Sequence, residues 1–291
     1  MTDAPQIISA VPTPFASDGK LDLAAFRSNL ERLEPLLDGV FAAGTTGEFP
    51  ALADDERVAV IQEAVAVFGP PRVVAHVGAA TTQQAVALTE AAQQVGARRF
   101  AAVTPYFLRA SLDGVSRYYA ALRQVVGDGE LYGYFFPDVA LTDVAPEDLP
   151  RLVEVGLDGV KVSGAASGRV AEYLSHAPAG FKLWSGNDAD LPNILANGGI
   201  GTVSGVSAVM PEPWVAFREA YAANDQDRLG RAQQAITALV PVLGPSIAHL
   251  KYGLSVLGLA GGPTRMSIDE PNPQLRTAIE AALDEARGYL A

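Results

Sequence analysis

The sequence of 291 residues contains no cysteine. This absence excludes disulfide bonds, thiolate nucleophiles, iron–sulfur clusters and zinc sites with cysteine ligands. Histidine is scarce too: the chain has three, scattered so that no H-x-x-x-H spacing of a metal site occurs. A metal-dependent enzyme is therefore disfavoured, unless the ligands come from separate strands. We expect no metal ion and no organic cofactor.

Basic residues are in the minority, with 21 Lys and Arg against 33 Asp and Glu, and they form no run. A protein that binds a nucleic-acid duplex needs a basic face to displace phosphate counterions, so a nucleic-acid partner is not expected. The N-terminus lacks a basic segment followed by a long apolar one, and no apolar stretch approaches the ~18 residues of a membrane span. These absences predict a cytoplasmic protein without a membrane partner.

Apolar residues make up 49% of the chain and charged residues 19%, which favours a large core. Short apolar or β-branched runs alternate with longer segments of helical period. The predicted strands are 7–15, 39–44, 72–78, 99–106, 130–137, 159–163, 181–185 and 201–206. The predicted helices that follow them are 23–37, 54–68, 82–95, 112–126, 146–155, 168–176, 190–196 and 212–223.

Eight strand-then-helix units predict an α/β fold, the (β/α)8 TIM barrel. The alternative, a doubly wound open sheet, usually has fewer units and a G-x-G-x-x-G turn after its first strand, which is absent here. The remaining residues show only helical segments, at 228–243, 247–257 and 274–290. We therefore predict a barrel domain over 1–224 and a C-terminal helical extension over 225–291.

Lys161 lies inside the sixth predicted strand and is the most unusual of the four lysines. A lysine in the middle of a barrel strand is costly unless it is paired or neutral, and a neutral amine is a nucleophile that forms a Schiff base with a carbonyl. The competing interpretation is a lysine near the strand end that reaches solvent or an acidic partner. Lys182 also lies in a strand, but at its start, which is the opposite end of a barrel from the usual active site.

Two further motifs end predicted strands. Gly44-Thr45-Thr46-Gly47-Glu48 closes the second strand, and its hydroxyl and backbone N–H groups suit a small carboxylate or phosphate, although such clusters also form ordinary turns. Tyr134 closes the fifth strand, where a phenol could relay a proton, although a buried structural tyrosine is commoner. In a barrel both motifs converge with Lys161.

These motifs, together with Tyr134-x-x-Pro137, Gly-Val-Lys161 and Ser185-Gly186-Asn187-Asp188, carry a resemblance over nearly the whole chain. The sequence resembles the pyruvate-dependent class I aldolase family that includes dihydrodipicolinate synthase and N-acetylneuraminate lyase. The resemblance implies that Lys161 forms the imine with pyruvate, and that Tyr134 moves protons with help from the Thr45 hydroxyl. The substrate-binding residues that it implies are Thr46, Gly47, Gly186 and Val203, and to these the chain's own carboxylates add Asp138 and Asp188.

One departure concerns the second substrate. Dihydrodipicolinate synthases carry an Arg two residues beyond the Pro of Tyr-x-x-Pro, and this chain has Val139 there, which cannot replace a bidentate guanidinium. Asp138, Asn187 and Asp188 would instead accept hydrogen bonds from the hydroxyls of a 2-keto-3-deoxy sugar acid. His76, in the third strand, is similar to the sialic-acid lyase side of the family, although a lone histidine on a buried strand is more often a core residue.

The resulting hypothesis is a lyase that cleaves or forms a C–C bond between pyruvate and an aldehyde, most plausibly in a 2-keto-3-deoxy sugar acid. Alternatives are a dihydrodipicolinate synthase-like condensation, or a dehydratase or decarboxylase that uses the same imine. A barrel that binds a keto acid without converting it is the non-enzymatic alternative. Relatives imply a homotetramer built from dimers. Tyr106 matches a tyrosine near a subunit interface, but Phe107 replaces the second tyrosine of the synthase pattern.

Overall fold

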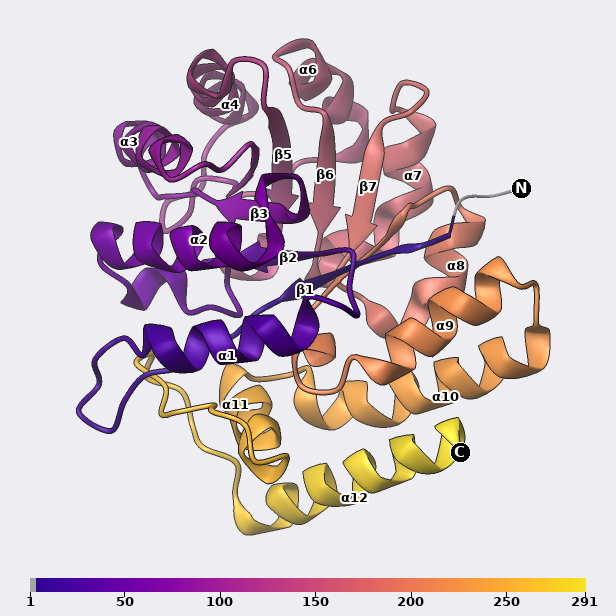
Figure 1. The fold of residues 1–291 in the computed structure, drawn as a ribbon. Coiled ribbons are helices and arrows are strands. Elements are labelled where there is room, and N and C mark those ends of the chain that lie inside the picture. The colour runs from indigo at the N-terminus through magenta and orange to yellow at the C-terminus, as the bar shows by residue number, and fades with distance from the viewer. Residues whose placement is uncertain (1–3) are drawn as a thin grey trace. The chain divides into compact units, whose positions relative to one another are not determined.

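The computed structural model describes residues 4–291 and contains eight parallel strands, closed into a barrel in the order of the sequence (Figure 1). The predicted (β/α)8 TIM barrel is therefore confirmed. The strands are β1 (Gln6–Ala10), β2 (Gly39–Ala42), β3 (Val73–His76), β4 (Arg99–Val103), β5 (Glu130–Phe135), β6 (Gly159–Val162), β7 (Lys182–Ser185) and β8 (Gly201–Ser204).

Helices follow the strands and make up the C-terminal part of the chain. The α-helices are α1 (Leu23–Leu33), α2 (Asp54–Phe68), α3 (Thr82–Gln94), α4 (Leu112–Val126), α5 (Pro137–Ala140), α6 (Leu149–Glu154), α7 (Val170–Ser175), α8 (Leu191–Ala196), α9 (Glu212–Ala222), α10 (Gln226–Leu243), α11 (Ile247–Val256) and α12 (Pro273–Leu290). The 3-10 helices are η1 (Phe49–Ala51), η2 (Pro70–Arg72), η3 (Pro146–Asp148), η4 (Gly164–Arg169), η5 (Asp188–Asp190) and η6 (Val206–Ala208). Over residues 4–291, no helix combines the length and apolar character needed to cross a membrane.

Side-chain caps start several of these helices. Thr81 and Ser111 accept hydrogen bonds from backbone N–H groups in the first turns of α3 and α4, and Asn272 does the same for α12. Such caps satisfy N–H groups that have no partner within the helix. Pro273 occupies the first turn of α12, where it removes no hydrogen bond.

The backbone contacts divide the chain into two compact units. One comprises Met1–Phe68 and Ser204–Ala291, and within its described residues it holds β1, β2, α1, α2 and α9 to α12. The other, Gly69–Val203, holds β3 to β7, most of β8, and the helices between these strands. The predicted boundary after residue 224 lies in the turn between α9 and α10, and the division into barrel and extension stays a prediction.

Strand register in the unit Gly69–Val203 defines which side chains share a face. Tyr134 is paired with Lys161, and Lys161 with Trp184. Because side chains alternate along a strand, Tyr132 and Lys182 lie on that same face, two residues earlier in β5 and β7. This face therefore has one layer of polar and aromatic side chains at the strand starts and a second layer at the strand ends.

The main difference from the predicted elements is at the strand ends. The first strand was expected over 7–15 but ends at Ala10, and Phe15 forms only an isolated bridge with Leu21. Pro12 and Pro14 have no N–H to donate to a neighbouring strand, which explains the early end. The helix α5 was not predicted, because Pro137, taken as the last strand residue, in fact begins it.

Candidate functional site

Lys161 and Tyr134 are direct neighbours at the carboxyl ends of β6 and β5. The Lys161 Nζ lies 4.3 Å from the centroid of the Tyr134 ring. Both side chains are buried, with 6% and 2% of their surface exposed. The alternative interpretation of Lys161 as a lysine that simply reaches solvent is therefore inconsistent with the structure. An amine beside a phenol can form an imine while the phenol moves a proton.

His76, the last residue of β3, packs against the same tyrosine. Its ring meets that of Tyr134 edge-on, with the centroids 6.0 Å apart, and it is fully buried. The Nε2 atom accepts a hydrogen bond from the backbone N–H of Val103, at 3.3 Å. An N–H can only donate, so Nε2 is the acceptor in this contact. His76 is thus both a buried residue and a neighbour of the candidate acid–base group.

A charged layer lies at the starts of the same strands. Glu130 pairs with Lys182 and with Arg99, and the Tyr132 hydroxyl donates to Glu130 at 2.6 Å. Burial favours the neutral carboxyl, but hydrogen bonds from Lys182 and Tyr132 outweigh it and lower the pKa of Glu130. Burial also raises the pKa of the Tyr132 phenol. The amine of Lys182 is therefore engaged in a structural ion pair, as its position at the strand start predicts.

Asp138, in α5, is tied to the segment that follows β6. Its Oδ2 accepts a hydrogen bond from the backbone N–H of Ala165, at 2.8 Å. Gly164, just before, has a φ of 57°, and a Cβ there would lie 2.1 Å from the Asp138 Oδ2. Only glycine fits this backbone so close to a carboxylate. This hydrogen bond engages one of the two carboxylate oxygens of Asp138 with the loop after β6.

A second carboxylate, Asp188, follows β7 and is turned inwards. It is 3% exposed and accepts a 2.6 Å hydrogen bond from the Thr202 hydroxyl in β8. Gly186 and Asn187, just before it, are exposed. Val203, the neighbour of Thr202 in β8, is buried. The structure therefore holds Asp188 against β8, while Gly186 and Asn187 are exposed, with their backbone N–H groups bonded to the Val162 carbonyl and the Ser185 hydroxyl.

One hydroxyl group beyond Lys161 was not identified from the sequence. Ser163 lies two residues beyond the lysine, and its Oγ would be 2.7 Å from a Cβ at Gly186. The alternation of β6, extended past its end, could have indicated Ser163, because it places that residue on the opposite face from Val162. Ser185, the first residue of the motif 185–188, donates to the Oγ of Ser167, which donates to the backbone of β6. Ser185 is paired with Val162 and therefore lies on the opposite face of the sheet from Lys161.

Thr45, Thr46 and Gly47 belong to the other unit and form a tight turn after β2. The backbone N–H of Glu48 donates to the Thr45 carbonyl at 3.0 Å. The Thr13 hydroxyl donates to the Gly47 carbonyl at 2.9 Å. Thr45 and Thr46 are half-buried, while Gly47 is buried. The predicted binding residues of this motif are therefore gathered in one fixed turn.

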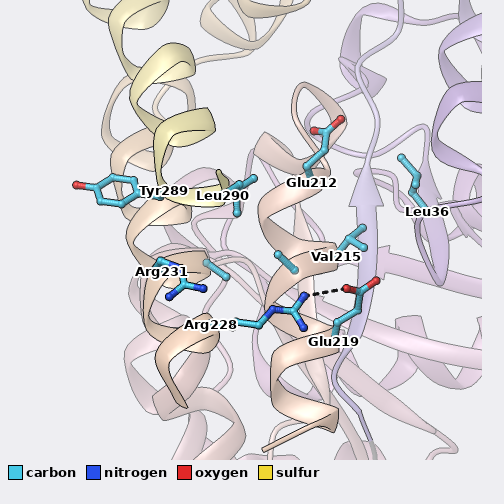
Figure 2. A pocket seen from close by; sticks show the side chains of 10 residues that line it. Leu36, Glu212, Val215, Glu219, Arg228, Arg231, Tyr289 and Leu290 are labelled. Carbon is cyan, nitrogen blue, oxygen red and sulfur yellow. Dashed lines mark hydrogen bonds and ion pairs between the residues drawn. The ribbon is translucent and has the colours of Figure 1, made fainter. Parts of the chain in front are cut away.

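A groove elsewhere on the unit formed by Met1–Phe68 and Ser204–Ala291 does not contain a lysine beside a tyrosine (Figure 2). It is lined by residues of α9, α10 and α12, together with Leu36, and none of the described residues that line it is a lysine. Arg228 is paired there with Glu219, at 3.3 Å. Across residues 4–291, no group of three or more His, Asp or Glu is arranged to hold a metal ion. The lysine–tyrosine pair of β5 and β6 is therefore the stronger candidate for chemistry.

Comparison with known proteins decides the family. The profile of the "Dihydrodipicolinate synthetase family" matches residues 3–286. The chain belongs to this family. It is 31% identical over 285 residues, 95% of each chain, to a protein of Thiobacillus denitrificans named 4-hydroxy-tetrahydrodipicolinate synthase. A protein of Mesorhizobium japonicum with the same name is 31% identical over 290 residues, 96% of this chain and 97% of its own.

Solved structures agree with this assignment. The structure of the 4-hydroxy-tetrahydrodipicolinate synthase from Methylacidiphilum fumariolicum SolV superposes with a TM-score of 0.91 at 26% identity. The superposition covers 98% of this chain and 97% of that one. Members of the dihydrodipicolinate synthetase family are lyases of the class I aldolase type, and this chain is an enzyme of that kind. The resemblance seen in the sequence motifs is thereby confirmed.

Proposed function

We propose that this protein is a pyruvate-dependent aldolase in which Lys161 forms a Schiff base with the keto carbon of pyruvate. The observation that carries the proposal is a buried lysine amine 4.3 Å from the ring of a buried tyrosine, in a chain of this family. Attack of the amine on the carbonyl releases one water molecule and gives a protonated imine. That imine withdraws electrons, so a proton can leave the methyl carbon and produce an enamine.

The other site residues take roles in the same proposal. Tyr134 carries protons to and from the imine and the substrate oxygen, aided by Thr45, while Thr46 and Gly47 bind the carboxylate of pyruvate. The enamine carbon then attacks the carbonyl carbon of an aldehyde, the aldehyde oxygen takes up a proton, and water releases the product from Lys161. The reverse sequence cleaves the same bond. Backbone N–H groups in a tight turn suit the carboxylate because they present fixed donors.

Two observations bear on the direction of the reaction and on the identity of the second substrate, and they favour different answers. The similar proteins of known name are synthases, which favours a condensation like theirs over cleavage of a 2-keto-3-deoxy sugar acid. In contrast, Val139 stands where an Arg would hold the carboxylate of the second substrate, and its side chain is half-exposed with no charge to offer. This observation favours, as the second candidate, an aldehyde that carries hydroxyls, with Asp138, Asp188 and the Gly186 backbone as its binding groups.

The proposed function is tested by reduction with borohydride in the presence of pyruvate, followed by mass spectrometry of the intact protein and its peptides. We expect a single adduct on Lys161, with the mass of pyruvic acid less one oxygen atom. A folded protein that gives no adduct with pyruvate or other 2-keto acids would contradict the imine. Turnover with pyruvate and either a carboxylate-bearing aldehyde or glyceraldehyde then separates the two candidate substrates.

We also propose that the protein self-associates, as a tetramer built from dimers. Phe107 and Leu108 follow β4 and are 80% and 74% exposed, an unusual state for large apolar side chains next to each other. Val139 and Leu141, in and after α5, are also exposed. All four lie in the unit Gly69–Val203. An interface over these residues would remove them from water.

Phe107→Asp is expected to weaken this association, because it places a charge in the centre of the apolar patch. Sedimentation velocity should show a shift towards a smaller species at the same protein concentration. Arg151→Asp, which changes an exposed residue of α6 in the same unit, serves as the control and should leave the sedimentation coefficient unchanged. A wild-type protein that sediments as a monomer would contradict the proposal.

A further inference from the structure

The turn that holds Thr45 and Thr46 ends in a buried carboxylate, Glu48. Its side chain is fully buried, and its Oε2 accepts hydrogen bonds from the backbone N–H groups of Arg265 and Met266, both at 2.8 Å. Its backbone is left-handed, with a φ of 57°. A non-glycine residue in this region is strained and persists only where its surroundings hold it. Glu48 is held by the segment between α11 and α12.

Lys251, in α11, completes the contact. Its Nζ lies 2.6 Å from the Glu48 Oε1, and only 2% of its side chain is exposed. The same Nζ donates to the Pro263 carbonyl at 2.7 Å and lies 4.3 Å from the centroid of the Phe15 ring. Burial lowers the pKa of Lys251, and the adjacent carboxylate of Glu48 counters that effect. The Glu48–Lys251 pair is thus enclosed by Phe15, near the start of the chain, and by the segment 263–266, near its end.

The same helix packs beside Thr46 at Gly205. A Cβ at Gly205, just after β8, would lie 3.2 Å from the Leu250 side chain and 3.3 Å from the Thr46 Oγ1. Thr46 and Leu250 of α11 therefore approach Gly205 with little free space. Displacing α11 or Glu48 would move the turn to which the proposed function assigns carboxylate binding.

We propose that Glu48 and Lys251 are positioning residues that fix the turn 44–47 in the geometry that binds the substrate carboxylate. This inference rests on the proposed function, in which Thr45 and Thr46 act on pyruvate. A buried ion pair contributes little net stability compared with apolar side chains of the same size, whereas loss of one partner leaves an uncompensated charge. Each single neutralisation should therefore disturb the turn, and neutralising both should disturb it much less.

The test measures the pyruvate concentration that gives half-maximal borohydride trapping, and the trapped fraction at saturating pyruvate. Lys251→Met removes the cationic partner of the buried Glu48 carboxylate. Glu48→Gln places an amide NH2 group next to the Lys251 ammonium. Both are expected to raise the half-saturating concentration by roughly tenfold or more and to change the saturating fraction little. The double variant, which has neither charge and keeps an oxygen for the Arg265 and Met266 amides, should return to within about threefold of the wild type.

Arg218→Met is the matched control. Arg218 pairs with Asp38, just before β2, at 2.9 Å and also donates to the Leu36 carbonyl. Its replacement therefore removes an ion pair and a hydrogen bond to a backbone carbonyl, as Lys251→Met does, but at the start of β2 instead of after its end. It should lower the melting temperature without changing half-saturation. Single variants of Glu48 and Lys251 that lose only thermal stability, or a double variant as impaired as the worse single one, would overturn the inference. A wild type that is never trapped contradicts the proposed function instead.

Discussion

Lys161→Ala is expected to abolish both the pyruvate adduct and turnover. No other group can replace the amine in the imine, because the carbonyl carbon needs a nitrogen nucleophile that can lose its proton. The rate should therefore fall to the background of the assay. Lys161→Arg is expected to be equally inactive, since a guanidinium stays protonated and cannot condense with a ketone. Adduct formation is read by mass spectrometry, and turnover by the consumption of pyruvate.

Lys182→Met provides the lysine control within the same sheet. Lys182 begins β7, is half-exposed and is paired with Glu130, so its removal should cost stability and leave the adduct on Lys161 in place. Peptide mapping distinguishes the two lysines directly. Retention of the adduct in Lys161→Ala, together with its loss in Lys182→Met, would move the nucleophile to the other end of the barrel strands and overturn the site.

Tyr134→Phe has the second largest expected effect. It removes one hydroxyl and keeps the ring that contacts Lys161 and His76. Turnover should fall by roughly 10²–10⁴, the usual contribution of a positioned acid–base group, which corresponds to about 3–5 kcal/mol of transition-state stabilisation. The adduct should still form, more slowly, because Lys161 is intact. A stopped time course of borohydride trapping separates the rate of imine formation from its final extent.

Tyr173→Phe is the matched control for that variant. Tyr173 is buried in α7 of the same unit, and its hydroxyl donates to the Val144 carbonyl at 2.6 Å. Its loss should lower the melting temperature and leave kcat within a small factor of the wild type. Equal falls in kcat for the two variants would show that any buried hydroxyl matters, and the acid–base assignment of Tyr134 would fail.

The order of strands and helices could be predicted from the sequence because every strand-then-helix repeat shows the same hydropathy pattern, a short apolar run followed by a segment of helical period. The helices over 54–68 and 112–126 have the predicted bounds. Strand ends were less accurate, because buried residues continue past the last residue of a strand into the loop that follows. Val77, Ala79 and Thr104 are all buried although they lie outside β3 and β4. Hydropathy alone cannot distinguish a buried loop from a buried strand.

The site was predictable to the extent that it depends on sheet register. Tyr134 and Lys161 each lie one residue before the end of a strand, β5 and β6, and parallel pairing of these strands makes them adjacent. The contacts of Asp138 and Asp188 could not be predicted, because each depends on a residue of the next strand-and-helix repeat, Ala165 after β6 in one case and Thr202 in β8 in the other. The pair of Glu48 and Lys251 is separated by about two hundred residues and has no local signal.

The close approach of Asp138 to Gly164 has a consequence for how such an enzyme could change over evolutionary time. A side chain at position 164 would collide with the carboxylate at position 138. A lineage that keeps the carboxylate at 138 is therefore confined to glycine at 164. Loss of that carboxylate does not lift the restriction, because a side chain at 164 would still lie 2.8 Å from the Phe136 ring and would have to adopt the left-handed backbone. Position 138 can therefore change while position 164 stays glycine, so only one of the two positions is open to substitution.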